Sequence, residues 1–334
     1  MARAGKPLVS VVLPVHNGDK TILRAVNSIL AQTLANWELV IINDGSTDQT
    51  LKRLVNINET RLKVVSLPHS GIAKALNFGL KMARGKYIAR MDADDECLPH
   101  RLEKQVAFLD QHPHVGLVAC QTVHVGSSDQ EGYRRHIAWT NELFSPDEIY
   151  HARFQDAPFA HPSVMFRKSL FYQYGGYSET NVPEDFELWL RWFHAGIRMQ
   201  KLPEVLLKWY DPPYRLSRTH PNYTSNLFFE VKAHYFARWY TKKEVKRPIW
   251  IFGTGRTVNH RIKPLKVAGI KPEKFIDVVP KTAAHIIHYQ DLPEVSERGP
   301  FLLSYVSDRK GKKEIKDFLE QRNYQEGTDF IMMA

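Results

Sequence analysis

Three carboxylates follow one another closely in the first third of the chain. Asp92, Asp94 and Asp95 stand directly after residues 87–91, a short apolar run that predicts a buried strand. Like charges at this spacing repel one another unless a cation lies among them. Oxygen ligands suit Mg²⁺ or Mn²⁺, and such ions usually bind through one or two carboxylates together with substrate phosphates. The spacing predicts a site for a divalent metal and a diphosphate; an acidic turn that caps the helix beginning near Pro99 is the alternative.

Other polar side chains also follow predicted strands. The apolar runs at residues 9–15 and 37–43 predict buried strands, and helical patterns of apolar residues separate the strands along the chain. Alternating strands and helices are typical of βαβ units in a mostly parallel sheet, where ligands bind at the carboxyl ends of the strands. His16, Asn17 and Asp44 follow such ends, as do the three aspartates. The sequence therefore predicts that these side chains gather at one edge of the sheet.

Composition is that of a globular protein with two domains. The chain has 334 residues, 43% of them hydrophobic, and none of its apolar runs reaches the roughly 18 residues of a membrane-spanning helix. We therefore expect no integral membrane span. The N-terminus lacks the apolar region of a signal peptide, and Cys97 and Cys120 are too few for a disulfide framework. Together these features predict a cytoplasmic protein.

The C-terminal part has its own α/β pattern and is more basic. We expect a catalytic domain over residues 1–240 and a small Rossmann-like domain over residues 241–334. The second of these holds eighteen Lys and Arg against twelve Asp and Glu, so it carries +6 of the net charge of +10. Gly253-Thr254-Gly255 follows a predicted strand but lacks the third glycine of a dinucleotide-binding turn. Packing or acceptor recognition is therefore the expected use of this domain.

Five ordered motifs resemble those of family 2 glycosyltransferases. They lie at residues 10–18, 43–48, 70–77, 89–95 and 184–189, and the resemblance covers roughly residues 7–220. It implies a GT-A fold, which is an α/β fold with a Rossmann-like, mostly parallel sheet. It also implies a nucleotide-sugar donor such as a UDP-sugar, a divalent metal (Mn²⁺ or Mg²⁺) and inversion at the anomeric carbon.

Each matching position takes its role from this resemblance. Asp185 would be the catalytic base, Asp94 a ligand of the metal that bridges the two phosphates, and His220 a second metal ligand. Arg215 and Arg218 are candidates for pairing with the diphosphate, because arginine binds phosphate through two hydrogen bonds. The positions that would contact the nucleotide-sugar are Pro14, His16, Asn17, Asp44, Gly71, Asn77, Arg90, Asp92 and Ala93.

Simpler structural roles stand beside several of these assignments. Asp44 and Asp185 lie where helix caps are common, His161 fits a core histidine, and His220 fits a surface histidine. A non-catalytic protein that binds a nucleotide-sugar or RNA is the alternative from another class. Binding alone needs no base, so the aspartate cluster together with Asp185 favours an enzyme that transfers a sugar.

The acceptor has two candidates. A glycan or a lipid-linked saccharide is the common acceptor in this family. Residues 182–185, the turn at residues 253–255 and residues 326–330 also resemble the animal queuosine-tRNA galactosyltransferase type, which adds a sugar to a modified tRNA base. A basic domain fits an RNA acceptor, because phosphate contacts supply affinity. The candidate RNA contacts, for which solvated surface charge is the alternative, are Lys242, Lys243, Lys246, Arg247, Lys310, Lys312 and Lys313.

Overall fold

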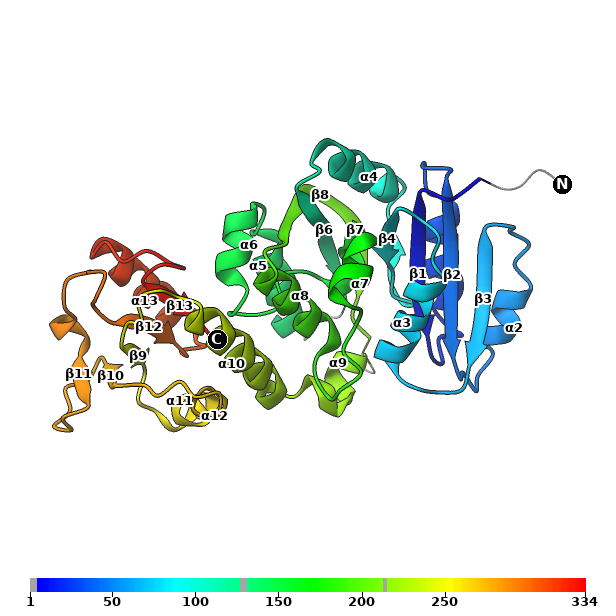
Figure 1. Ribbon diagram of the computed structural model, residues 1–334. Helices are drawn as coiled ribbons and strands as arrows, with labels where there is room; N and C mark the ends of the chain where they lie inside the picture. Colours follow the sequence, from blue (N-terminus) through cyan, green and yellow to red (C-terminus); the bar gives the residue numbers. More distant parts are fainter. Residues whose placement is uncertain (1–4, 127–130, 213–214) are drawn as a thin grey trace. The chain divides into compact units, whose positions relative to one another are not determined.

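The computed structural model describes residues 5–126, 131–212 and 215–334, which form two compact units (Figure 1). Unit 1 comprises the described residues of Met1–Ile149, Pro158–Thr180 and Glu187–Thr219. Unit 2 comprises Tyr150–Ala157, Asn181–Phe186 and His220–Ala334. The expected domain boundaries, residues 1–240 and 241–334, stay a prediction. No helix among the described residues has both the length and the apolar character needed to cross a membrane.

Unit 1 is built on an eight-stranded sheet in the order β3-β2-β1-β4-β7-β6-β8-β5. Strand β1 pairs in parallel with β2 and β4, whereas β7 pairs antiparallel with β4 and β6 (Figure 1). The prediction of an α/β fold with a mostly parallel sheet is thus confirmed. The strands are β1 (Val9–Val15), β2 (Trp37–Asp44), β3 (Leu62–Leu67), β4 (Tyr87–Arg90), β5 (Glu96–Cys97), β6 (Val115–Val125), β7 (Met165–Arg167) and β8 (Arg198–Tyr210).

Helices bury both faces of the first strands, which explains their continuous apolar runs. In β2, Leu39 and Ile41 share a core with helix α1, whereas Val40 and Ile42 share one with helix α3. Strands buried on both faces do not alternate between apolar and polar residues. The helices whose described residues lie wholly or partly in unit 1 are α1 (Ile22–Leu30), α2 (Thr50–Val55), α3 (Ile72–Met82), α4 (Arg101–Gln111), α5 (Glu131–Asn141), α6 (Pro146–Ala152), α7 (Ser169–Tyr174), α8 (Glu184–His194) and α9 (Leu216–Thr219).

Two segments differ from the sequence-based expectation. The residue pattern at 161–166 favours one strand, but His161–Ser163 is a 3₁₀ turn and the strand begins at Met165. Pro162 lacks the N–H that a strand would use, and the Ser163 hydroxyl donates to the carbonyl of Ala160 at 2.7 Å. The prolines and aromatic residues at 209–221 favour a loop, but β8 continues through Tyr210 because it pairs with β6 up to that residue. Positions 213–214 of this range lie outside the described residues.

Unit 2 contains a second, fully parallel sheet in the order β11-β10-β9-β12-β13 (Figure 1). Helix α10 carries Lys232, whose buried amine donates to the carbonyls of Gln155 and Met333. These bonds fasten two segments distant in sequence to one helix, and burial lowers the pKa of Lys232 to about 8. The main elements are α10 (Ser225–Thr241), β9 (Ile249–Phe252), α11 (Arg256–Arg261), α12 (Lys263–Val267), β10 (Lys274–Asp277), β11 (Ile286–His288), β12 (Phe301–Ser304), α13 (Arg309–Gln321) and β13 (Phe330–Met332).

A buried polar network fixes the start of β4 against β1 and β2. Glu38 accepts hydrogen bonds from the Ser10 hydroxyl at 2.7 Å, from the Arg84 backbone N–H at 2.7 Å and from Lys63 at 3.0 Å. The Ser10 hydroxyl oxygen also accepts from the backbone N–H of Gly85 at 2.8 Å. The network therefore ties the connection between α3 and β4 to the two neighbouring strands.

We predict that Glu38→Gln destabilises the protein by about 1.5–3 kcal/mol at pH 7, because charged hydrogen bonds are lost. Burial raises the pKa of Glu38, but the bonds from Ser10, Arg84 and Lys63 outweigh burial and lower it. The stabilisation is therefore present above the unfolded pKa and is lost as the pH falls through the lowered folded pKa. Urea unfolding should show this difference in free energy of unfolding between the parent and Glu38→Gln at pH 7, and a smaller difference in acid. Glu142→Gln, at an exposed carboxylate, serves as control.

Candidate functional site

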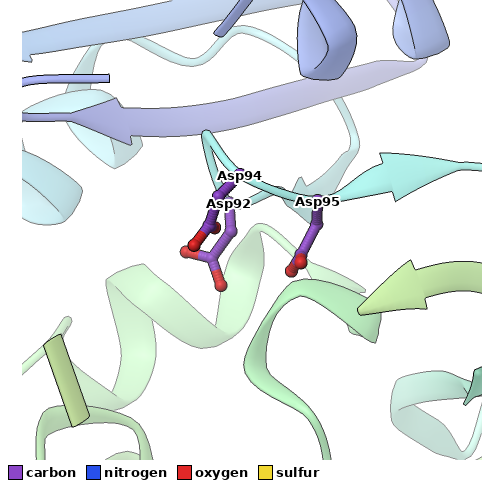
Figure 2. A group of neighbouring side chains, drawn as sticks. All are labelled: Asp92, Asp94 and Asp95. Carbon is purple, nitrogen blue, oxygen red and sulfur yellow. The ribbon is translucent and has the colours of Figure 1, made fainter. Parts of the chain in front are cut away.

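The three aspartates occupy the tight turn between β4 and β5. Their carboxylate oxygens lie within 4.8 Å of one another, and Figure 2 shows all three side chains extending to one side of the turn. The backbone N–H of Met91 donates to the Val12 carbonyl at 3.1 Å, which anchors the turn to β1. Asp95 accepts from the backbone N–H of Tyr210 at 2.7 Å, which anchors it to β8. The turn is thus held from two strands of the sheet.

Burial makes ionisation of the carboxylates in this turn unfavourable. Burial, and then the charge of Asp92, raise the pKa of Asp94, and Arg215 opposes the rise. Burial raises the pKa of Asp95 well above its usual value. One Asp95 oxygen, Oδ2, is buried and has no hydrogen-bond partner among the described residues. Three close carboxylates with an unused buried oxygen match the donor set of a hard divalent cation, so the residues present fit Mg²⁺ or Mn²⁺.

Two arginines from different segments form ion pairs with the aspartates. Arg90, the last residue of β4, forms an ion pair with Asp92. Arg215 lies 3.3 Å from Asp92 and 3.9 Å from Asp94, and burial would lower its pKa but the three aspartates raise it. Arg218 lies elsewhere, because it pairs with Asp211 at 2.6 Å. Among the predicted diphosphate-binding arginines, Arg215 therefore reaches the aspartate cluster.

The carboxylate of Asp44 organises the turn at the start of α3. It accepts from the backbone N–H groups of Ser70 at 2.8 Å and Gly71 at 3.0 Å, and it lies 3.0 Å from the His69 ring nitrogen Nδ1. Gly71 has a φ of +92°, a conformation that favours glycine. Asp44 therefore joins the end of β2 to the turn that follows β3, rather than capping the helix next in sequence.

His16 and Asn17 connect two further strand ends into one surface, which we call the ledge (His16, Asn17, Asp44 and His69). The His16 ring lies 2.7 Å from the Asp44 carbonyl, and its centroid is 4.2 Å from that of the His69 ring. Asn17 accepts from the Thr47 N–H at 2.8 Å. His69 was missed at the sequence level, although it follows β3 as His16 follows β1. Its position after a predicted strand is the signal that identifies it.

The remaining predicted contacts of unit 1 have structural partners. Asn77 is buried and bonds both the N–H and the carbonyl of Tyr177, at 2.8 and 2.9 Å. His161 lies 2.8 Å from the Tyr177 hydroxyl, and burial, followed by the charges of Arg90 and Arg215, lowers its pKa well below the usual value. These contacts agree with a core role for His161. Pro14 lies in β1, and Ala93, between Asp92 and Asp94 in the chain, is half-buried.

Asp185 and His220 belong to unit 2. Asp185 is the second residue of α8, is half-buried and accepts from the backbone N–H of Phe186 at 2.7 Å. The neighbouring Glu184 accepts from the Tyr223 hydroxyl at 2.6 Å. His220 is exposed, and its ring accepts from the Asn222 N–H at 3.2 Å. This cap is a structural use for His220, and its role as a metal ligand stays a prediction.

A solved structure of similar fold identifies the fold of this protein. A crystal structure of Staphylococcus aureus TarS, residues 1–349 in complex with UDP-GlcNAc, matches with a TM-score of 0.56 and 22% sequence identity. The match covers 77% of this chain and 70% of that one. The fold is that of the GT-A glycosyltransferases, as the sequence motifs predicted.

Sequence relatives place the chain within this class. The model of glycosyl transferase family 2 matches residues 10–175. A Bacillus subtilis protein provisionally named as the glycosyltransferase EpsE is 36% identical over 209 residues, which cover 60% of this chain and 72% of the relative. The O-antigen biosynthesis glycosyltransferase WbnJ of Escherichia coli is 30% identical over 241 residues, 71% of this chain and 90% of the relative. The chain belongs to glycosyl transferase family 2.

We predict that Asp44→Asn loosens the turn before α3. The amide NH₂ cannot accept the N–H bonds that one carboxylate oxygen accepts, and a buried unmet donor costs about 1–3 kcal/mol. Hydrogen exchange at the Ser70 and Gly71 amides should therefore accelerate about 10- to 100-fold, whereas amides within β3 keep their rates. Unchanged protection of both amides would contradict the anchoring role of Asp44.

Proposed function

We propose that this protein is a metal-dependent, inverting hexosyltransferase that moves a sugar from a UDP-sugar to an acceptor hydroxyl. The observation that carries the proposal is the aspartate cluster on the β4–β5 turn, in the same GT-A unit as the ledge around Asp44. A nucleotide-sugar needs both kinds of site, one for the nucleoside and one for the diphosphate. The TarS structure with the same fold was solved with UDP-GlcNAc, which supports a uridine donor.

The ledge is the proposed nucleoside subsite. The Asp44 oxygens retain lone pairs for a donor N–H or hydroxyl of the nucleoside. The His16 ring offers a flat face, and Pro14, Asn17, Gly71 and Asn77 complete the surroundings of the base and ribose. We assign Ala93 and Asp92 to the sugar side of the donor.

The aspartate cluster is the proposed diphosphate subsite. Asp94, with His220 as a candidate second ligand, would hold Mn²⁺ or Mg²⁺, which neutralises charge on the leaving phosphate as a Lewis acid. Arg90 keeps Asp92 in place through its ion pair. The buried Asp95 oxygen Oδ2, which has no hydrogen-bond partner among the described residues, supports the proposal.

Asp185 is the proposed general base. The acceptor oxygen forms a bond to the anomeric carbon while the bond from that carbon to the phosphate oxygen breaks, and the hydroxyl proton passes to Asp185. The nucleoside diphosphate leaves with the electron pair of the broken bond. One displacement from the opposite face inverts the configuration. The position of Asp185 in the first turn of α8 favours its ionised form, because the N-terminal end of a helix carries partial positive charge.

A glycan or a lipid-linked saccharide is the proposed acceptor. WbnJ is named for O-antigen biosynthesis, and AmsE of Erwinia amylovora, 32% identical over 206 residues, is named for amylovoran biosynthesis. We also propose a cytoplasmic location. Cys97 and Cys120 are both free thiols, as expected for a protein of a reducing compartment.

A modified base of tRNA is the second candidate acceptor, and one observation in unit 2 favours it. A hollow of about 410 Å³ brings cationic and aromatic side chains together. Such surfaces suit nucleic acid, because cations meet phosphates and aromatic rings stack on bases. The side chains of these two kinds that line it are Trp239, Tyr240, Lys242, Lys243, Arg247 and Phe301.

We predict that Asp185→Asn lowers kcat by about 10²–10⁴-fold, because general-base catalysis contributes that much. The Kd for UDP should stay at its parent value, since Asp185 is not assigned to the donor. Glu187→Gln, two residues along the same helix and paired with Arg191, is the matched control and should keep the parent rate. Transfer by Asp185→Asn at the parent rate would remove the base assignment; it would also favour a different catalytic residue.

Labelled UDP-galactose, UDP-glucose and UDP-N-acetylglucosamine with Mn²⁺ should label a glycan and lipid extract rather than total tRNA. A matched pair of variants sharpens this experiment. Lys242→Ala/Lys243→Ala alters the hollow of unit 2, whereas Lys52→Ala/Lys81→Ala removes the same charge from exposed positions of unit 1. Label in tRNA that only the first pair reduces would replace the saccharide acceptor with RNA.

A further inference from the structure

Arg215 lies beside the aspartates that would bind a metal ion. Its two terminal nitrogens lie 3.3 Å from an Asp92 oxygen and 3.9 Å from an Asp94 oxygen. Charged hydrogen bonds between nitrogen and carboxylate are usually about 2.7–2.9 Å long. The guanidinium therefore neutralises the carboxylates without binding them tightly in a two-pronged pair.

The closer contacts of Arg215 are to uncharged groups. Its Nη1 donates to the Tyr210 carbonyl at 2.6 Å, and its central carbon lies 3.8 Å from the centre of the Trp209 ring. Both contacts come from the end of β8, so the side chain is supported from behind and faces the aspartates. A guanidinium held in this way can change its anionic partner while its support remains.

Arg90 differs from Arg215 in each of these respects. Arg90 is 2% exposed and forms a short ion pair with Asp92, two residues along the chain. Arg215 is 12% exposed and comes from a segment more than a hundred residues away in sequence. Of the two cations, Arg90 is the fixed one and Arg215 is the one that can be exchanged.

Two side chains that follow Arg215 make contacts outside the aspartate cluster. Arg218 pairs with Asp211 at 2.6 Å, and the Ser217 hydroxyl lies 3.1 Å from the Tyr133 hydroxyl. Tyr133 also lies beside the Trp209 ring, with 5.5 Å between ring centres. These contacts do not depend on the partner that Arg215 has.

We infer that Arg215 is the resident cation of the aspartate cluster, and that it exchanges these carboxylates for the donor's diphosphate when a divalent metal binds. The inference rests on the proposed function, because it takes the metal and the diphosphate as ligands. A metal that enters alone must displace Arg215 and leaves that charge without an anion. A metal that enters with a nucleoside diphosphate supplies Arg215 with a new one. Metal and donor therefore bind with positive coupling, each strengthening the other.

The test is Mn²⁺ binding measured by electron paramagnetic resonance of the free ion, with and without UDP. A site whose binding-competent state is populated about one-tenth of the time binds about tenfold more weakly. We therefore expect Arg215→Gln to bind Mn²⁺ alone about tenfold more tightly than the parent. UDP should strengthen Mn²⁺ binding less in this variant, and sugar transfer should fall. Arg215→Lys keeps the positive charge, so its Mn²⁺ affinity should lie between those of the parent and of Arg215→Gln.

Arg61→Gln is the matched control. Arg61 pairs with Glu59 and also lies 3.8 Å from the centre of a tryptophan ring, that of Trp37, but it is outside the aspartate cluster. This substitution removes an arginine that is stacked and paired in the same unit, and it should leave Mn²⁺ binding unchanged. Mn²⁺ affinity of Arg215→Gln equal to or weaker than that of the parent would overturn the exchange.

Two further outcomes separate this inference from the proposed function. Failure of every variant and of the parent to bind Mn²⁺, with UDP bound normally, would overturn both the exchange and metal dependence. Failure to bind UDP would overturn the donor assignment, while the Mn²⁺ titration without UDP still decides whether Arg215 competes with the metal.

Tryptophan fluorescence gives a second measurement on the parent protein, independent of whether Arg215→Gln folds. Mg²⁺ with UDP should change the emission of Trp209, because its stacked guanidinium turns to a new partner. Mg²⁺ avoids the quenching caused by paramagnetic Mn²⁺. The change should be absent in Trp209→Phe, which keeps an aromatic ring in this place. An identical change in both proteins would show that Arg215 stays in place.

Discussion

The site depends on one electrostatic constraint, which is the burial of three carboxylates in a single turn. Three carboxylates this close together are stable only where cations face them, and Arg90 at the end of β4 and Arg215 in the segment after β8 do so. The surrounding structure serves this need. The network of Glu38 sets the start of β4, and Asp95 ties the turn to the end of β8. The same charge that burdens the folded protein is what makes the turn suited to a metal and a diphosphate.

The sequence predicted the fold best where local pattern and tertiary packing agree. Strand β1 was expected at its observed residues, because both faces of the strand are buried and its apolar run is continuous. Strand β8 was incompletely anticipated, since its 13 residues include Pro203 and Glu204 and its pairing partner β6 lies far away in sequence. Local patterns carry no information on such pairings.

The candidate site shows the same division. Asp92, Asp94 and Asp44 could be found because each follows a strand of a parallel sheet. The position of Arg215 among the aspartates could not be found, because it depends on where β8 ends and on the Trp209 ring beneath the guanidinium. The donor contact of Asn77 stays a prediction, and its described hydrogen bonds hold residues 177–179. A motif indicates a residue's importance without distinguishing a ligand contact from a supporting one.

The ledge has a consequence for how this enzyme class diversifies. His16 and Asn17 are exposed and bond mainly to neighbouring turns, while the strands beneath them are closed to solvent. A substitution at exposed His16 would therefore change what the proposed nucleoside subsite offers to a nucleobase at little cost in folding stability, whereas Asp44 holds the turn before α3. The aspartate turn has no such freedom, because its carboxylates depend on the charges of Arg90 and Arg215. In the proposed function, the nucleoside subsite would thus tolerate change at an exposed side chain on the same scaffold, whereas the proposed diphosphate subsite would not.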